Sequence, residues 1–265
     1  MKTFYGNWAL VAGAAEGIGE AFSQALARRR MNLIMVDRNE EKLQLLSNQL
    51  TTEYGIETIT SVMDLSGEDA WQRCLRLTEG LDCNLLVYVP AYSVVRPFLD
   101  NTPGDLDSFV NLNCRTPLKL VHSFGSRMKE NKKGGIILMS SLAGIIGPQY
   151  VSVYAATKAF NIRLGEALYH EFREYGVDIL VCCAGITDTP AYWSGNPYLG
   201  PGHPDLMKAE DVAEYGLKNL GRKAICIPGW KNRLNFFILT RLLPGSLASS
   251  IVNKAMTKFY PEIST

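Results

Sequence analysis

The sequence predicts an α/β fold in which one parallel β-sheet is covered by helices on both faces. Short apolar runs alternate with longer amphipathic stretches along all 265 residues, which is the pattern of repeated strand–helix–strand units. Several of the apolar runs are almost continuously hydrophobic, as strands buried on both sides are. No linker, low-complexity tract or internal repeat divides the chain, so we expect residues 1–265 to form a single domain.

Seven strands and six helices are expected in alternation. The predicted strands are residues 8–13, 32–37, 57–64, 84–89, 135–141, 177–183 and 224–228. The predicted helices are residues 17–30, 39–54, 66–80, 103–131, 152–175 and 207–221. Turn residues separate these elements, for example "NKKGG" before the fifth strand and "EYG" before the sixth.

The composition excludes several classes of function. Hydrophobic residues make up 47% of the chain and charged residues 20%, with a formal net charge of +1, so nothing supports nucleic-acid binding. The six cysteines form no CxxC pair and no metal-like spacing, and we expect no metal site and a reduced, cytoplasmic setting. We see no signal peptide and no apolar run near the roughly 20 residues that span a bilayer.

A glycine-rich turn follows the first strand directly, in the stretch "AGAAEGIGEAF". Between a strand and a helix, such glycines permit a tight turn, close approach of a pyrophosphate and close helix packing. The N-terminus of the helix then supplies free N–H groups and a partial positive charge. We therefore assign cofactor binding to the residues of this turn: Gly13, Ala15, Glu16, Gly17, Ile18 and Gly19.

The ends of the second and third strands bear on which dinucleotide is bound. Asp37 lies about 20 residues past the glycines, where a carboxylate can hold an adenosine ribose and repel a 2′-phosphate. Arg38 could instead receive a 2′-phosphate, and a purely turn-forming aspartate is a further alternative. Because the glycine turn carries Glu16 and no lysine or arginine, we favour NAD(H), with NADP(H) as the alternative. Asp64 and Leu65 would hold the adenine.

A tyrosine and a lysine stand four residues apart in "SVYAATKAF", so Tyr154 and Lys158 share one face of a helix. A free phenol, with a pKa of about 10, is a poor acid or base at neutral pH, and a nearby ammonium would lower that pKa. An exposed helix face without function is the alternative. Ser141, at the end of the fifth strand, can reach the phenol. Asn113 lies inside a predicted helix although asparagine has a low helix propensity, which indicates a side-chain role or a local irregularity.

Together these features resemble the short-chain dehydrogenases/reductases over nearly the whole chain. The resemblance rests on "AGAAEGIG", on the gap of 13 residues from Ser141 to "YAATK", on Asn113 and on "AGITDT" after the sixth strand. It implies a Rossmann fold, a nicotinamide cofactor and Tyr154 as general acid/base. By the same resemblance, Ser141 would hold the substrate oxygen and Lys158 would bind the nicotinamide ribose and lower the phenol pKa. Asn113 would anchor a water in the proton relay.

The sequence departs from the family pattern in supporting positions. Ala12 stands where threonine is usual, and the fourth strand ends in "YVPA" (88–91) where the family commonly reads Asn-Asn-Ala-Gly. The pair Ala184-Gly185 replaces Pro-Gly after the sixth strand. Since the four catalytic positions are intact, we interpret these changes as drift in the supporting structure.

Two segments in the C-terminal third bear on the substrate and on partners. By resemblance, residues 187–207 would form a substrate lid, with Thr187 and Thr189 hydrogen-bonded to the nicotinamide carboxamide. Residues 230–259 hold five Lys/Arg and no Asp/Glu. This basic, apolar segment could meet a membrane surface, line a lipophilic substrate channel, or pack on the body or on a second subunit. Family members pair through long helices, which implies a homodimer or homotetramer.

The sequence thus predicts an oxidoreductase that transfers a hydride between a nicotinamide cofactor and a carbonyl or secondary alcohol, with a lipophilic substrate favoured by residues 230–259. A catalytically silent dinucleotide-binding sensor or scaffold of the same fold is the alternative. An epimerase or dehydratase acting on nucleotide sugars uses a similar tyrosine–lysine pair, but it normally needs a larger C-terminal domain than this length provides.

Overall fold

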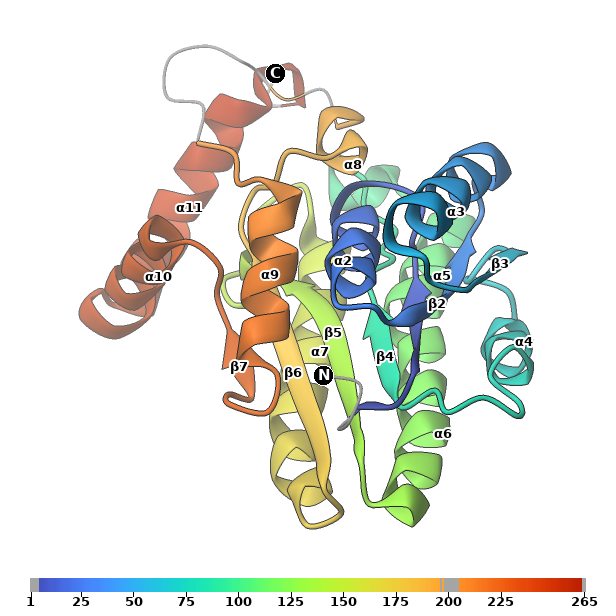
Figure 1. Ribbon diagram of the computed structural model, residues 1–265. Helices are drawn as coiled ribbons and strands as arrows, with labels where there is room; N and C mark the ends of the chain where they lie inside the picture. The colour runs from blue at the N-terminus through green and yellow to red at the C-terminus, as the bar shows by residue number, and fades with distance from the viewer. Residues whose placement is uncertain (1–4, 196, 198–204, 264–265) are drawn as a thin grey trace.

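The computed structural model describes residues 5–195, 197 and 205–263, and it contains a seven-stranded parallel sheet between two layers of helices (Figure 1). The strands run in the order β3-β2-β1-β4-β5-β6-β7, and every neighbouring pair is parallel. Their bounds are β1 (Trp8–Ala12), β2 (Asn32–Asp37), β3 (Thr58–Val62), β4 (Leu85–Tyr88), β5 (Gly134–Ser141), β6 (Val177–Ala184) and β7 (Ile225–Cys226). The predicted fold class is confirmed. The order reverses between β1 and β4, where open α/β sheets bind their ligands.

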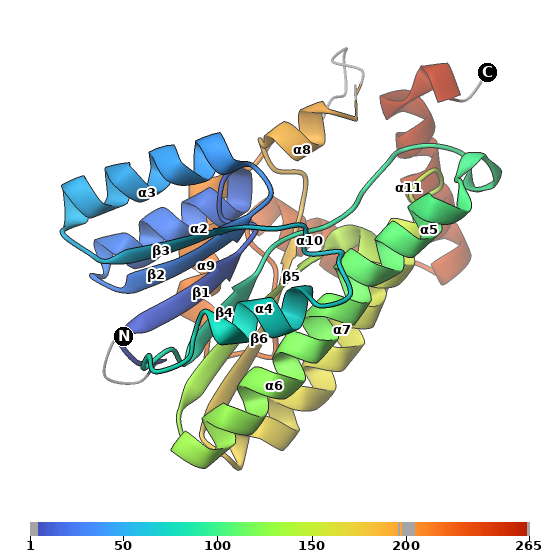
Figure 2. The same cartoon turned by 90° about the vertical axis from the view of Figure 1, so that its right-hand side faces the viewer.

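Helices cover both faces of the sheet because central strands such as β1 present apolar side chains to each face in turn. On β1, Ala9 and Val11 belong to one core cluster, whereas Trp8, Leu10 and Ala12 belong to the other. The first cluster lies under α2 (Gly17–Arg28), α3 (Glu40–Tyr54) and α9 (Ala209–Asn219). The second lies under α4 (Ala70–Arg76), α6 (Thr116–Asn131) and α7 (Ser152–Arg173), as Figure 2 shows.

The long helix predicted over residues 103–131 is interrupted. It consists of α5 (Pro103–Val110), a π-helical turn at Asn111–Arg115 and α6. The irregularity expected at Asn113 is therefore present. The predictions for α4 and β7 were too long, since residues 66–69 form a turn in which Asp64 accepts the Ser66 N–H at 2.8 Å, and β7 pairs with β6 at only two positions.

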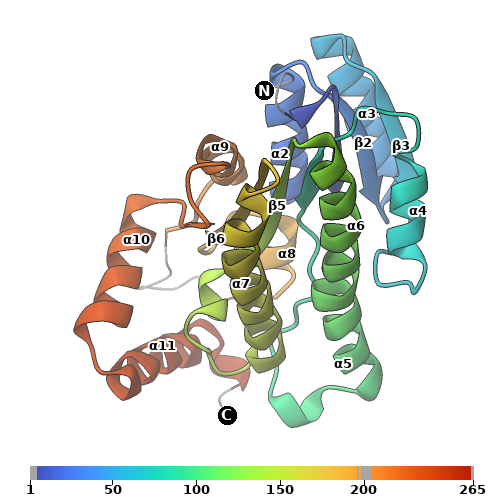
Figure 3. The ribbon, with the colours of Figure 1, turned by 90° about the horizontal axis from the view of Figure 1, so that it is seen from below.

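Three helices were missed by the sequence prediction: α8 (Pro190–Trp193), α10 (Trp230–Phe237) and α11 (Gly245–Phe259). A π-helical turn at Ile238–Leu242 joins α10 to α11, and short 3₁₀ turns cover Phe98–Asp100, Leu142–Gly144 and Pro261–Ile263. Figure 3 shows α10 and α11 beside α7, on the opposite side of the molecule from α3 and α4. Among the described residues, no helix is long and apolar enough to cross a bilayer.

Candidate active site

Close packing fixes α7 against β5 and β6. A Cβ at Gly165 would lie 2.2 Å from Val181 Cγ2, and one at Gly144 would lie 2.7 Å from Ala159 N. Both glycines therefore let backbone and side chains approach more closely than any larger residue would. Ser140 Oγ also donates to the Lys158 carbonyl at 2.9 Å. These contacts position the first turns of α7 at the carboxyl edge of the sheet.

Tyr154 and Ser141 meet at this edge, as the sequence predicted. Ser141 accepts the Ala143 N–H at 3.2 Å and is hydrogen-bonded to the phenol of Tyr154. The pKa of Tyr154 is raised, because burial disfavours the phenolate, and the hydrogen bond with Ser141 offsets part of this rise. In the protein alone the Tyr154 hydroxyl is therefore protonated at neutral pH.

Lys158 lies close to Tyr154 and is itself buried. Its Nζ is 5.6 Å from the Tyr154 ring centroid and donates to the Met139 carbonyl at 2.9 Å. The side chain is 2% exposed, and burial lowers the pKa of its amine to about 8. In the protein alone desolvation dominates the pKa of both groups, and the lowering of the Tyr154 pKa by Lys158 stays a prediction for the enzyme with its cofactor bound.

Asn113 braces the site from the π-helical turn and is fully buried. Its Oδ1 accepts the Tyr92 N–H at 2.7 Å, while Nδ2 donates to the Tyr92 carbonyl at 3.0 Å and to Thr157 Oγ1 at 2.9 Å. Both amide hydrogens are therefore used by protein groups, and the side chain joins the loop after β4 to α7. The expected water at Asn113 stays a prediction.

Sequence reasoning missed Asn161. This residue is 2% exposed, and its Nδ2 donates to the Asn113 carbonyl at 3.0 Å. Its Oδ1 is buried without a hydrogen-bond partner among the described residues, an arrangement that water commonly satisfies. The signal was present in the sequence, because Asn161 lies seven residues after Tyr154 and three after Lys158, on the same helix face.

The unusual "YVPA" end of β4 is structurally compensated. The Tyr88 hydroxyl donates to the Leu112 carbonyl at 2.6 Å, so it takes up a backbone group in the π-helical turn. Pro90 packs beside the glycine turn, where a Cβ at Gly13 would lie 2.9 Å from Pro90 Cγ. The departure from the family pattern thus preserves the link between β4 and the Asn113 turn.

The glycine turn has the geometry that the sequence predicted. Gly13 and Gly17 have φ values of +74° and +58°, which favour glycine. A Cβ at Gly19 would lie 1.7 Å from the Gly13 carbonyl oxygen, so only glycine fits. Glu16 is the N-cap of α2 but makes no side-chain cap, which leaves N–H groups of the first turn available to an anion. Ala15 is buried and Ile18 packs against the core of this face.

The carboxylate of Asp37 braces the same turn. Its Oδ2 accepts the Ala15 N–H at 3.0 Å and its Oδ1 accepts the Asn39 N–H at 3.1 Å. Arg38 is exposed. Lys42, which sequence reasoning did not consider, reaches back from α3 to Glu16 at 2.5 Å. The turn therefore has a cation beside it, although its own residues include none.

The remaining predicted cofactor residues lie along the carboxyl edge. Asp64 is exposed just after β3, and Leu65 is buried and accepts the Thr116 hydroxyl with its carbonyl at 2.8 Å. The hydroxyls of Thr187 and Thr189 donate to the Gly185 and Thr187 carbonyls at 3.0 and 3.3 Å. Of the predicted lid, residues 196 and 198–204 lie outside the described residues.

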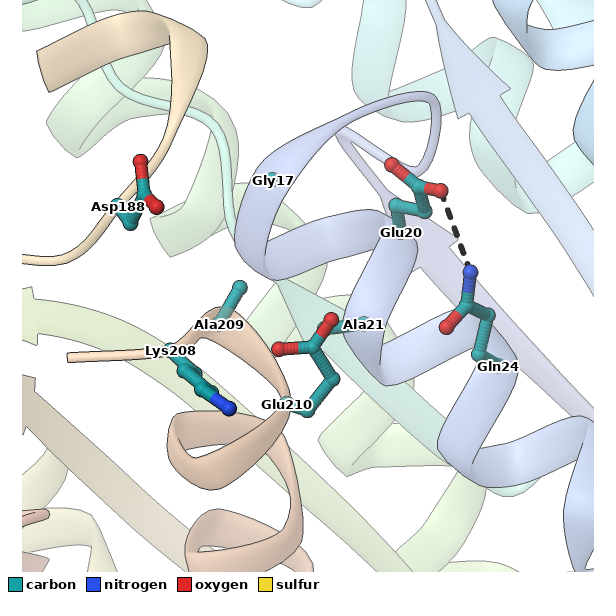
Figure 4. Close-up of a pocket in the computed structure, with 8 residues that line it drawn as sticks. All are labelled: Gly17, Glu20, Ala21, Gln24, Asp188, Lys208, Ala209 and Glu210. Carbon is teal, nitrogen blue, oxygen red and sulfur yellow. Dashed lines mark hydrogen bonds between the residues drawn. The ribbon is translucent and has the colours of Figure 1, made fainter. Parts of the chain in front are cut away.

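A small cavity of about 210 Å³ lies between α2 and the start of α9 (Figure 4). Glu20 and Glu210 both line it, together with Asp188 and Lys208. The pKa of Glu20 is raised, chiefly by burial and then by the neighbouring Glu210 carboxylate. Because its lining carries three carboxylates and a single amine, this cavity does not suit the diphosphate of a dinucleotide. Among the described residues, no group of three or more His, Cys, Asp or Glu side chains could hold a metal ion.

The C-terminal segment is attached to the loop that leads from Ser141 to α7. Gln149 N donates to Asn253 Oδ1 at 2.7 Å, and its Nε2 donates to the Asn253 carbonyl at 3.1 Å and to Thr257 Oγ1 at 2.7 Å. These bonds fasten α11 to the loop between Ser141 and α7. Tyr260 lies near the lid, since a Cβ at Gly195 would be 3.7 Å from its hydroxyl.

Comparison with known proteins identifies the family. A family model described as short chain dehydrogenase matches residues 7–197. The chain is 33% identical over 237 residues to a 7beta-hydroxysteroid dehydrogenase of Collinsella aerofaciens, a match that covers 88% of this chain and 90% of the relative. It is 34% identical over 253 residues to a very-long-chain 3-oxoacyl-CoA reductase of Podospora anserina, which covers 93% of this chain and 74% of the relative.

A solved structure agrees with these sequence matches. It is described as "Structural and biochemical insights into 7beta-hydroxysteroid dehydrogenase stereoselectivity", and it has a TM-score of 0.88 at 29% identity, covering 95% of this chain and 98% of that one. The similarity thus extends over the sheet, the glycine turn and the Ser141–Tyr154 edge. The chain therefore belongs to the short-chain dehydrogenase/reductase family, a family of oxidoreductases that bind nicotinamide cofactors.

Proposed function

We propose that this enzyme interconverts a carbonyl and a secondary alcohol, with Tyr154 as the general acid/base. The observation that carries the proposal is the hydrogen-bonded pair of Ser141 and Tyr154, set beside the buried amine of Lys158 at the carboxyl edge of the sheet. This is the edge at which ligands of open α/β sheets bind.

The glycine turn and the α7 face fit a nicotinamide dinucleotide. The narrow backbone turn at Gly13 and Gly19 and the uncapped start of α2 suit a diphosphate. Lys158 would hold the ribose next to the nicotinamide. When bound, this cofactor supplies or accepts the hydride.

The proton chemistry belongs to residues of the chain. The raised pKa of Tyr154 keeps its hydroxyl protonated, so it can donate its proton to the substrate oxygen as a carbonyl is reduced. In the reverse direction the phenolate takes the proton back. Ser141 donates a second hydrogen bond to the same oxygen and orients it. Lys158, whose amine has a pKa of about 8, would stabilise the phenolate once its Nζ turns from Met139 to the ribose.

The substrate is proposed to be large and apolar, such as a steroid-like alcohol or a long-chain ketone. The names of the two relatives support this class, since they describe enzymes of a hydroxysteroid and of very-long-chain 3-oxoacyl-CoA. The apolar segment 230–259, fastened over the Ser141 loop through Gln149, also supports it.

Tyr154→Phe tests this function against the silent sensor or scaffold. With a panel of ketones and NADH or NADPH, we expect about a 10³-fold loss of kcat, since a positioned acid/base contributes about 10²–10⁴-fold. Cofactor affinity should change less than about twofold, because phenylalanine keeps the aromatic ring and lacks only the hydroxyl. Equal turnover by both proteins would refute the role of Tyr154. Cofactor binding without turnover of any ketone by the unsubstituted enzyme would favour the sensor.

For the cofactor we propose NAD(H), because the Asp37 carboxylate at the end of β2 would face a 2′-phosphate with its negative charge. Arg38 and Lys42 are the cations that could oppose this preference. Fluorescence titration with NADH and NADPH measures the ratio of the two dissociation constants. A strong preference for NADPH, reduced by Arg38→Ala or Lys42→Ala, would overturn the assignment.

A further inference from the structure

The C-terminal helical arm, defined as α10, the π-helical turn and α11 (residues 230–259), is unusually exposed. Of its 30 residues (230–259), only Ala248 is buried. Helices of this length gain most of their stability from packing an apolar face. An arm with so little burial therefore presents much of its apolar surface to its surroundings.

The exposed apolar residues form one stripe on each helix. On α10 the stripe consists of Trp230, Leu234 and Phe237, which are 65%, 48% and 52% exposed. On α11 it consists of Leu247 and Ile251, which are 47% and 45% exposed. The spacings of three and four residues place the members of each stripe on one helix face.

The charges of the arm are of one sign. It holds five Lys/Arg and no Asp/Glu. Lys231 is ion-paired to Asp205, and Arg233 donates to the Ile227 carbonyl at 3.2 Å. Arg241, Lys254 and Lys258 are exposed, and none of them has an ion-pair partner among the described residues. Lys254 and Lys258 continue the α11 stripe at the same helical spacing.

We propose that this arm docks on an anionic lipid surface. Apolar stripes that include a tryptophan and a phenylalanine and are accompanied by lysine and arginine are typical of helices that lie in a membrane interface. Such cations are attracted to anionic headgroups. A second copy of the chain is a poorer occupant, because a two-fold contact would bring the same cations together from both subunits.

Docking would bring the lipid close to the substrate side of the site. Gln149 fastens α11 to the loop that follows Ser141, and Tyr260 follows α11 directly and lies near Gly195 of the predicted lid. An apolar substrate could therefore enter from the lipid without crossing water. The docking itself is independent of turnover and does not require the proposed function to hold.

Co-sedimentation of the full chain with vesicles tests the proposal. We expect binding to vesicles that contain phosphatidylcholine and phosphatidylglycerol, and about a hundredfold weaker binding to phosphatidylcholine alone, because each of three cations contributes about fivefold. Raised salt should release the protein from the anionic vesicles. Equal binding to both vesicles, or no binding to either, would overturn the proposal.

Paired substitutions locate the surface. Leu247→Glu with Ile251→Glu, and separately Lys254→Glu with Lys258→Glu, should each weaken vesicle binding by at least about tenfold. Leu45→Glu is the matched apolar control, since Leu45 is 63% exposed on α3, and Lys223→Glu is the exposed charge control. Both should bind as the unsubstituted chain does. Thermal unfolding checks that every variant is folded. If the controls lose as much binding as the arm variants, the proposal fails.

Sedimentation equilibrium without lipid tests whether a second copy of the chain, and not lipid, covers the C-terminal helical arm. If the arm docks on lipid, the arm variants should leave the oligomeric state unchanged. An oligomer that dissociates when Leu247 and Ile251 become glutamate would assign this surface to a second copy instead.

Discussion

The corner between β5 and α7 and the C-terminal arm use polar and apolar residues in opposite ways. In the corner, Asn113, Lys158 and Asn161 are polar and almost fully buried, and nearly all of their polar atoms have protein partners. In the arm, Trp230 and Leu242 are apolar and are 65% and 62% exposed. The corner is therefore held by specific bonds, whereas the arm presents an exposed apolar surface, which we propose docks on lipid.

The largest expected difference between the tightly packed carboxyl edge of the sheet, here at the glycine turn, and the arm comes from adding one methyl group. Gly19→Ala would place a Cβ 1.7 Å from the Gly13 carbonyl oxygen, whereas nothing lies within 4 Å of a Cβ at Gly245 in the arm. We expect Gly19→Ala to abolish cofactor binding and to lower the free energy of unfolding by more than about 3 kcal/mol. Gly245→Ala should change that energy by less than about 1 kcal/mol. Urea denaturation and cofactor titration measure both, and similar effects would contradict the comparison.

Lys158→Met should separate stability from activity. Below pH 8 the amine is charged in both states, and the folded state bears the full cost of burying that charge. Between pH 8 and 10.5 the unfolded chain binds more protons than the folded one, so stability of the unsubstituted protein rises with pH there. The variant lacks this rise. At pH 7 it should be more stable by up to about 3 kcal/mol, and the difference should vanish above pH 10.5.

Urea denaturation of the Lys158→Met variant at pH 7 and at high pH tests this prediction. Its kcat should at the same time fall by about 10²-fold or more, since the phenolate loses its cation. A variant that is less stable at pH 7 would mean that the bond to the Met139 carbonyl outweighs the burial of charge.

Asn113→Ala should lower the free energy of unfolding, because it leaves buried backbone groups without hydrogen-bond partners. It removes the acceptor of the Tyr92 N–H and the donor to the Tyr92 carbonyl. We expect the free energy of unfolding to fall by about 2–3 kcal/mol. Asn101→Ala is the matched control, because within the described part of the chain the Asn101 side chain bonds only to the nearby Pro97 and Phe98 carbonyls. If the two variants are equally stable, the bracing role of Asn113 is refuted.

Gln149→Ala should have the smallest effect, because it only loosens the contact between corner and arm. It removes two side-chain bonds to α11, to Asn253 and to Thr257, and we expect a loss of about 1 kcal/mol. If the proposed function holds, KM for a large apolar substrate should rise, while kcat stays within about twofold of that of the unsubstituted enzyme. A kcat that falls as much as KM rises would show that Gln149 acts on the reacting groups themselves.

Much of the fold followed from local pattern. The apolar runs placed all seven strands, and β2 has the bounds that were predicted. The glycine turn was predicted in detail, because close backbone approach leaves only glycine at those positions. Asn113 was singled out by its poor helix propensity, and a π-helical turn lies there.

Tertiary contacts account for what the sequence did not predict. Lys42 lies 26 residues from Glu16 in sequence, so reading the glycine turn alone missed this cation. The pKa of Tyr154 depends on how deeply α7 is packed, which spacing does not reveal. Few apolar residues of the arm pack on the body, among them Phe236 and Ala248. The basic composition of 230–259 therefore indicated the chemistry of the arm but not its two helices.

The π-helical turn at Asn111–Arg115 holds one residue more than an α-helical turn would. Deleting Leu112 would allow a continuous α-helix and would keep α5 and α6 nearly in phase, because an i→i+5 turn takes up one extra residue in place of a single α-helical turn. The surplus residue therefore alters the widened turn itself, which carries Asn113. A protein shortened by that single position would keep its helix content and lose the turn from which Asn113 bonds to Tyr92 and Thr157.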